Sequence, residues 1–339
     1  MIACSKFESD LYSFIQAQVN AAPLVKREGQ CTTGAYCIDL PPGEHVLNQT
    51  IKIPVDKNIN IKGCGPWATV IINNTGTPYI VEAEGGNNVG HVFTMQGFSS
   101  EGGAVLVNRR RGLTRIQDAK FTETTVPAMH FVGEDSGLGA VRVIIDTVDT
   151  AFCQQGASFE MRSNSLITVE RSRFIATYGE AILMDSIGSL ISNCHFTGAD
   201  ECFVRYGGDV ERSSHHTLRD SYFGNEDRPA KNGQGTIDAP DYSVIIGPAR
   251  LPGAVLRFRD NYHAGRENDT KPGALAAFRM EDSARDVHIS GSYFSSSYQN
   301  WIVNEANSGL ARRNYWHQNM VQNGAPPVFS AGGVGWTQD

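Results

Sequence analysis

The sequence predicts an all-β fold, a single-stranded right-handed parallel β-helix in which short strands wind into a solenoid behind an N-terminal capping α-helix. A short strand-like segment recurs along most of the chain, and a second strand ending in an aromatic residue lies between successive copies. The sequence also combines 35 glycines with a charged fraction of only 19 %. This composition is typical of proteins with many short strands joined by turns.

The N-terminal cap is predicted from the segment SDLYSFIQAQVNAA, residues 9–22. Its apolar residues recur at helical spacing behind a Ser-Asp start, which favours a short amphipathic helix. A solenoid needs such a cap because its terminal coil would otherwise expose the core. We therefore divide the chain into a capping segment (1–30), a β-helix (31–325) and a C-terminal tail (326–339).

The recurrent strand has eight copies. They are AVLVN (104–108), PAMHF (127–131), ASFEMR (157–162), EAILMD (180–185), ECFVRY (201–206), GTIDA (235–239), AAFRM (276–280) and NWIVNE (300–305). Units this short cannot bury an apolar face alone, so they become stable only when they stack on their neighbours.

The intervening strand ends in an aromatic or related residue, as in LTRIQDAKF, SLITVERSRF and HTLRDSYF. Neighbouring coils of a solenoid are about 4.8 Å apart, so like residues pile up along its axis. The sequence therefore predicts an internal aromatic ladder made of Phe121, Phe174, Phe196, Phe223 and Phe294.

The bulk properties exclude two classes of function. The formal net charge of −7 and the isoelectric point near 5.7 argue against a general nucleic-acid-binding protein, which needs a basic surface. No run of about 18 apolar residues is present, so no transmembrane helix is predicted. We expect neither nucleic acid nor a membrane among the partners.

The cysteines and sequons favour a secreted, extracellular protein. Cys31 could pair with Cys37, and Cys4 with Cys64, in an oxidising compartment. The other three cysteines fall in strand-like runs and are expected to be buried thiols: Cys153, Cys194 and Cys202. Asn-X-Ser/Thr triplets also fit secretion, and no signal peptide is visible after the initial methionine.

The passage behind the helix, CIDLPPGEHVLNQTIKIP followed by INIKGCGP and ATVII, resembles the entry region of right-handed parallel β-helix proteins of the pectate-lyase-like superfamily. That superfamily includes polysaccharide lyases, glycoside hydrolases and phage tailspikes. The stretch SHHTLRDSYFGNEDRPAKNGQG is similar to the alginate-lyase and chondroitinase-B-like family, but FRMEDS stands where that family has Lys-Ser. The resemblance implies the fold and a polysaccharide ligand, without that family's lysine base.

The outward positions of the recurrent strand form the candidate site, because alternate side chains of a strand point to opposite faces. We take as inward Val107, Met129, Phe159, Leu183, Val204, Ile237, Phe278 and Val303. The next residue of each copy is then outward: Asn108, His130, Glu160, Met184, Arg205, Asp238, Arg279 and Asn304. Neighbouring pleats add Arg110, Arg162, Glu180, Glu201 and Glu281. Most of these are poor strand formers, so their concentration indicates a surface for a linear polar polymer.

Three activities fit this surface. A polysaccharide lyase would use Arg205 and Arg279 to neutralise a uronate, and His130 or a neighbouring arginine to abstract the adjacent proton. A glycosidase would use Glu160 and Asp238 as its two carboxyl groups, with further glutamates in reserve. A non-catalytic tailspike or adhesin would use the surface only to hold a glycan.

We predict an enzyme that cleaves an acidic, uronate-containing polysaccharide, with β-elimination as the leading mechanism and the other two activities as alternatives. The expected catalytic residues are His130, Glu160, Arg205, Asp238 and Arg279. The expected substrate-binding residues are Asn108, Arg110, Arg162, Glu201, Glu281 and Asn304. No dedicated metal site is predicted, but clustered acids could supply oxygen ligands for Ca²⁺: Asp200, Glu201 and Asp209. The oligomeric state is left open between monomer and homotrimer.

Overall fold

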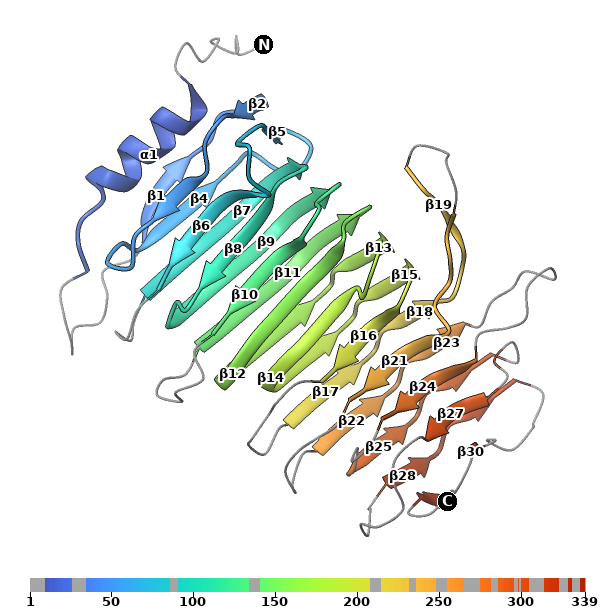
Figure 1. The fold of residues 1–339 in the computed structure, drawn as a ribbon. Coiled ribbons are helices and arrows are strands. Elements are labelled where there is room, and N and C mark those ends of the chain that lie inside the picture. The colour runs from blue at the N-terminus through green and yellow to red at the C-terminus, as the bar shows by residue number, and fades with distance from the viewer. Residues whose placement is uncertain are drawn as a thin grey trace.

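The computed structural model is a parallel β-helix, which confirms the predicted fold class (Figure 1). It describes residues 10–25, 35–85, 91–133, 141–207, 215–231, 236–247, 255–264, 275–281, 286–295, 298, 300–304, 314–322, 329–330 and 336–338. The coils follow one another along a single axis in chain order, and strands of successive coils pair in parallel.

The predicted N-terminal helix is α1 (Leu11–Ala21), and it closes the first coils. Asp10 caps its first turn, and its buried residues are four apart: Leu11, Ile15 and Val19. The Gln16 side-chain amide donates to the Lys52 carbonyl at 3.1 Å and accepts from the Lys52 N–H at 3.0 Å. Gln16 therefore satisfies the open backbone edge of β3 (Ile51–Ile53), where a preceding coil would otherwise be needed.

Each coil has three faces, which we number in the order in which the chain passes through them from β3 onward. The first face consists of β3, β6 (Tyr79–Glu84), β8 (Ala104–Asn108), β10 (Pro127–Val132), the first parts of β12 (Gln155–Glu170) and β14 (Ile182–Ser192), β16 (Cys202–Tyr206), β21 (Tyr242–Ile246), β24 (Ala276–Met280), β27 (Asn300–Asn304) and β30 (Phe329–Ser330). This face carries most of the predicted site.

The second face consists of β1 (Tyr36–Asp39), β4 (Ile59–Lys62), the first parts of β7 (His91–Glu101), β9 (Gly112–Thr122) and β11 (Val141–Ala151), the last parts of β12 and β14, β17 (His215–Arg219), β22 (Val255–Arg259), β25 (Val287–Ser290), β28 (Asn314–His317) and β31 (Trp336–Gln338). Both β30 and β31 lie in the interval assigned to the C-terminal tail, so the parallel pairing of the coils extends to these residues of the tail.

The third face consists of β2 (Gly43–Leu47), β5 (Thr69–Asn73), the last parts of β7, β9 and β11, β13 (Arg173–Thr177), β15 (His195–Ala199), β18 (Tyr222–Gly224), β23 (Tyr262–Ala264), β26 (Tyr293–Phe294) and β29 (Met320–Val321). A pair of antiparallel strands, β19 (Arg228–Pro229) and β20 (Thr236–Ile237), stands apart from the coils.

The predicted aromatic ladder lies inside the third face. Ring centroids are 5.3 Å apart between Phe174 and Phe196, and 5.0 Å apart between Phe196 and Phe223. His263 continues the stack at 4.6 Å from Phe223 and 4.8 Å from Phe294. Burial lowers the pKa of His263 to about 3, so a neutral imidazole takes the place of a phenyl ring.

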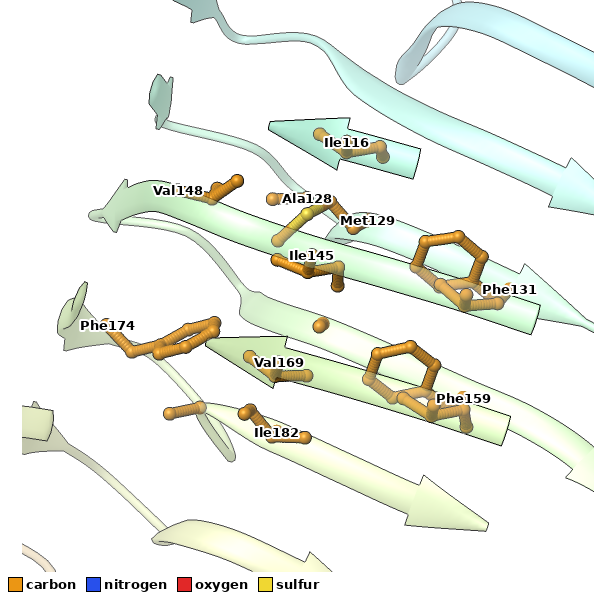
Figure 2. Close-up of a cluster of buried hydrophobic side chains, with 14 of the residues drawn as sticks. Ile116, Ala128, Met129, Phe131, Ile145, Val148, Phe159, Val169, Phe174 and Ile182 are labelled. Carbon is orange, nitrogen blue, oxygen red and sulfur yellow. The ribbon is translucent and has the colours of Figure 1, made fainter. Parts of the chain in front are cut away.

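Aromatic residues are also aligned elsewhere in the core. Phe121 has the register of the ladder, but Thr150 separates it from Phe174. Behind the first face, Phe131 stacks on Phe159 at 5.0 Å, with aliphatic side chains around the two rings (Figure 2). The core therefore runs without interruption along the axis beneath the candidate site.

Three cysteines are buried thiols as predicted: Cys153, Cys194 and Cys202. Cys37 and Cys64 carry free thiols, and the partners suggested for them, Cys31 and Cys4, lie outside the described residues. None of the helices in the described ranges has the length and apolar character that crossing a membrane requires.

Candidate active site

Two neighbouring columns of side chains point outward along the first face. The first column contains Lys52, Glu82, Leu106, His130, Ser158, Leu183, Arg205, Ile245, Arg279 and Val303. The second contains Glu84, Asn108, Val132, Glu160, Asp185 and, further on, Glu281. Seven coil spacings of about 4.8 Å separate β6 from β24, so the two columns run side by side for roughly 34 Å. An extended oligosaccharide could lie along them.

His130 bridges Tyr79 and Glu160. Its Nε2 lies 2.9 Å from Glu160 Oε1, and its Nδ1 lies 3.1 Å from the Tyr79 hydroxyl. A carboxylate only accepts hydrogen bonds, so in the neutral imidazole Nε2 carries the hydrogen and Nδ1 accepts from Tyr79. The result is a phenol–imidazole–carboxylate chain, an arrangement that can relay a proton.

Tyr79 is a site residue that sequence reasoning missed. It lies on β6, two coils before the histidine, in a segment upstream of the first recognised copy of the repeat. Burial raises the pKa of its phenol, and the nearby carboxylates of Glu82 and Glu160 raise it further. The signal that could have revealed this coil is the end of YIVEAE, where buried Val81 and Ala83 alternate with Glu82 and Glu84.

Arg205 is enclosed by carboxylates of the protein itself. Its Nε donates to Glu180 Oε1 at 3.0 Å, and its terminal nitrogens lie 3.6 Å from Glu281 Oε1 and 4.0 Å from Glu201 Oε2. Gln155 donates to the other oxygen of Glu180 at 3.1 Å. The charge of Arg205 is therefore balanced within the protein before any substrate binds.

Glu201 and Glu180 form a coupled carboxyl pair at the corner between the third and first faces. The pKa of Glu201 is raised by burial and then by the charge and hydrogen bond of Glu180, while Arg205 opposes this shift. Two adjacent carboxyl groups resist double ionisation. Of the two carboxyl groups, Glu201 is therefore the one whose pKa is raised.

Asp200 and Asp238 place two more carboxyl groups beside this pair. The Asp238 N–H donates to Asp200 Oδ1 at 3.1 Å, and Thr236 Oγ1 donates to Asp238 Oδ1 at 3.1 Å. Burial raises the pKa of Asp200, and the carboxylate of Asp238 adds to that rise. Since Asp200 directly precedes Glu201, all four carboxyl groups belong to one corner.

An arm that contains residues 225–231 and 236–239 crosses this corner. It contains β19 and β20 and extends beyond the coils near β18 (Figure 1). Lys231 forms an ion pair with Glu123, four coils nearer the N-terminus. Arg228 packs over Gly198, where an added Cβ would lie 2.6 Å from Arg228 Cγ. The arm therefore runs along the corner that holds Glu180 and Glu201.

The assignment of Arg110 to substrate binding is wrong. Only 2 % of this residue is exposed, and its guanidinium donates to backbone carbonyls, including that of Glu84 at 2.8 Å. Burial lowers its pKa to about 10. Arg110 ties the early coils together because the chain turns inward after β8, and it takes no part in the outer surface.

The register predicted for two copies is also wrong by one residue. Leu183 and Val303 face outward in the first column, whereas Met184, expected outward, is buried beneath it. In both segments at least three apolar residues follow one another, so the alternation that defines the two faces is absent from the sequence. Asn304 pairs with the buried Met280, and its side chain lies outside the described part.

The copy assigned to GTIDA is not a coil of the solenoid. Ile237 lies in β20 of the arm, so Asp238 belongs to the arm, and the true strand of this coil is β21. Arg279 stays in the first column, with its guanidinium 5.3 Å from the ring of Tyr242. The side chain of Arg162 lies outside the described residues.

No set of three or more histidine, cysteine, aspartate or glutamate side chains within the described ranges is arranged to hold a metal ion. Asp209, one of the three suggested calcium ligands, lies outside those ranges. The remaining two, Asp200 and Glu201, are engaged with Asp238 and Glu180.

No protein-family model matches the sequence. No curated protein matches it either. Among solved structures, a protein of Geobacillus virus E2 from open reading frame 18 has a TM-score of 0.49 and 13 % identity, over 98 % of this chain and 57 % of its own. The catalytic unit of an α-1,3-glucanase from Streptomyces thermodiastaticus has a TM-score of 0.45 and 14 % identity, over 98 % and 65 %. The A-module of a mannuronan C-5 epimerase from Azotobacter vinelandii has a TM-score of 0.40 and 13 % identity, over 95 % and 96 %. The chain thus spans less than two thirds of the first two proteins, and its structural neighbours include carbohydrate-active ones.

Proposed function

We propose that this chain is a glycoside hydrolase that cleaves an uncharged glycan lying along the first face. The observation that carries the proposal is that Glu180 and Glu201 lie together around Arg205, where partial burial and the neighbouring carboxyl group raise the pKa of Glu201. A carboxyl group that keeps its proton to a higher pH can donate it to the glycosidic oxygen, which is the task of the general acid.

Asp238 is proposed as the second carboxyl group of the reaction. It sits on the arm beside Asp200, so it can approach a sugar at this corner from a different side than Glu201. In this role Asp238 takes a proton from water as the water attacks the anomeric carbon. Glu201 gives its proton to the departing sugar, so the two carboxyl groups exchange their protonation states.

The charge of the face leads us to propose an uncharged glycan instead of the uronate polymer expected from the sequence. In the described residues the two columns carry five carboxylates and three cations, and the Glu180–Glu201 pair at the corner adds further negative charge. The carboxylates of the columns are Glu82, Glu84, Glu160, Asp185 and Glu281, and the cations are Lys52, Arg205 and Arg279. Lys52 and Arg205 already form ion pairs with the protein's own carboxylates. An anionic polymer would therefore meet net repulsion.

β-Elimination is the second candidate function, and the contact between Tyr79 and His130 favours it. In that reaction the phenol–imidazole–carboxylate chain would take the proton next to a uronate carboxyl group. A glycan with neutralised uronates, such as a methyl ester, would avoid the repulsion described above. Because such polymers lie outside cells, either function includes the extracellular location expected from the sequence.

The test is an assay of the chain with uncharged polymers (dextran, hydroxyethylcellulose and glucomannan) and with polygalacturonate and its methyl ester. Reducing ends and the ultraviolet absorbance of unsaturated ends are measured together. Hydrolysis predicts reducing ends from an uncharged polymer without absorbance. Absorbance from a uronate polymer would establish elimination instead. The absence of both signals would favour a non-catalytic glycan-binding protein.

A further inference from the structure

A shallow groove lies at the corner between the second and third faces, away from the carboxyl pair. Two rows of side chains from three successive coils line it: Asn193, Asp220 and Asp260 in one row, and His195, Tyr222 and Tyr262 in the other. The five residues of β15 separate this corner from that of Glu201, which is roughly 16 Å in an extended strand. The proposed hydrolase site uses none of these residues.

The first row repeats because each coil makes the same turn at this corner. Asn193, Asp220 and Asp260 all adopt left-handed backbone conformations, with φ of 54°, 51° and 56°. Asn and Asp tolerate this conformation better than other residues with a Cβ. Because the three turns have the same backbone conformation, their side chains point in the same direction, one coil apart. The row therefore offers hydrogen-bond acceptors, and one amide donor, at about 4.8 Å intervals.

The second row is a stack of aromatic rings on the outside of the third face. Ring centroids are 4.7 Å apart between His195 and Tyr222, and 5.4 Å apart between Tyr222 and Tyr262. Tyr293 extends the stack at 4.8 Å from Tyr262. Because the rings cover one another's faces, they present their edges outward, and 43 % of Tyr262 is exposed. Tyr262 is the most exposed ring of the stack, so a ligand can reach the stack at its outer edge.

The charges at the groove restrict the ligand. Burial lowers the pKa of His195, and the nearby charges of Arg173 and Arg228 lower it further, so this ring is neutral at pH 7. Arg219 lies beside the groove, with its Nε 3.6 Å from Asp220 Oδ2. The lining carries carboxylates, amide and hydroxyl groups, and no cation. It suits neither an anionic polymer nor an apolar helix.

From this geometry we propose that the groove is a second, non-catalytic site for an extended uncharged glycan. Sugar hydroxyls can donate to the carboxylates of Asp220 and Asp260, and the exposed tyrosine edges can contact the apolar C–H faces of the sugar rings. The coil spacing is close to the length of one sugar residue in an extended glycan. Successive sugars of the glycan therefore contact the same two rows, and the weak contacts of each sugar add to the total affinity. Binding here does not depend on cleavage at Glu201.

The test is affinity electrophoresis in gels that contain dextran, hydroxyethylcellulose or glucomannan, with polygalacturonate as the anionic control. The test variant is the double substitution Asp220→Asn and Asp260→Asn, which keeps the side-chain shape and suits the left-handed backbone. The matched control is Asp118→Asn, because Asp118 has φ of 48° at the same corner four coils before Asp220, outside the groove. All proteins also carry Glu201→Gln to prevent digestion of the gel.

We expect at least one uncharged polymer to retard the parent protein and the Asp118→Asn control equally. The double variant should bind about tenfold more weakly, and Tyr262→Ala should weaken binding similarly. Equal retardation of the parent and the double variant, retardation by polygalacturonate alone, or no retardation by any uncharged polymer would overturn the proposal. Failure of the hydrolase proposal would show instead as absent cleavage, with the retardation unchanged.

Discussion

His130 Nε2 lies 2.9 Å from Glu160 Oε1, although 30 residues separate the two in the sequence. The contact is diagonal, because Glu160 stands opposite Val132 in the neighbouring coil and reaches back toward the histidine. The two residues were expected on one face, and this contact depends on coils that stack in register. Tyr79, from a third coil, completes the chain.

His130 is predicted to bind the glycan without carrying out the hydrolytic step. The coil spacing places it roughly 14 Å along the axis from Arg205, which is the centre of the carboxyl cluster. His130→Asn should therefore raise KM about three- to tenfold and change kcat less than twofold. Steady-state kinetics on the cleaved polymer measures both constants. A loss of kcat by about a hundredfold or more would instead assign the chemistry to the Tyr79–His130–Glu160 chain.

Glu180 is predicted to control the alkaline side of the pH–rate profile. The charge and hydrogen bond of Glu180 help to raise the pKa of Glu201. Glu180→Gln removes that charge, so the pKa of Glu201 falls and the acid loses its proton at a lower pH. The alkaline limb of kcat/KM should therefore move to lower pH. The exposed Glu44 of β2 offers a control, since Glu44→Gln should leave the limb unchanged.

His263 is predicted to make the fold sensitive to acid. Its pKa is about 3 in the folded chain, against about 6.5 when unfolded, so the unfolded chain binds more protons between these values. Stability from the neutral ring is complete above pH 6.5 and falls as the pH drops toward 3. His263→Phe should remove this dependence.

Neither ring nitrogen of His263 has a hydrogen-bond partner within the described residues. His263→Phe should therefore also stabilise the fold at pH 7, on the order of 1 kcal/mol, because it removes buried unpaired polar atoms. At pH 4 the gain should be larger by roughly 3 kcal/mol. Chemical denaturation at both pH values measures this, with His215→Gln at an exposed position as the control. An equal gain in stability at both pH values would contradict the lowered pKa of His263.

Arg110 is predicted to stabilise the fold and to take no part in substrate binding. Arg110→Ala leaves several backbone carbonyls without their charged donor and opens a cavity, so it should cost roughly 3 kcal/mol or more. Arg109→Ala, at the adjacent exposed position, should cost less than about 1 kcal/mol. Denaturation curves give these values. If folded Arg110→Ala protein showed an unchanged midpoint and a raised KM, the substrate-binding role would be restored.

The sequence was sufficient for the architecture because a solenoid repeats its signals. The aromatic ladder, the helical cap and the shared face of His130, Arg205 and Arg279 all follow from periodicity. The prediction of which residues face inward was wrong where the sequence has no periodicity. Around Met184 consecutive residues are apolar, so nothing local distinguishes the buried side from the exposed one.

The partners of the site residues could not be predicted from the sequence. The contact between Glu201 and Glu180 depends on two corners meeting one coil apart, and the position of Asp238 depends on an arm that folds back along the axis. Arg110 shows the same limit, because corner geometry decides which residue of an arginine run turns inward. Arg109, with φ of 53°, is the residue that makes this turn.

The most direct test of the central claim is the rate at which reducing ends are released by Glu201→Gln, compared with the parent chain and with Glu44→Gln. The glutamine keeps the shape of Glu201 but has no proton to give to the leaving sugar. The account predicts that Glu201→Gln loses activity by about a hundredfold or more, while it stays folded and Glu44→Gln keeps full activity. Full activity in Glu201→Gln would contradict the assignment of this carboxyl group as the acid.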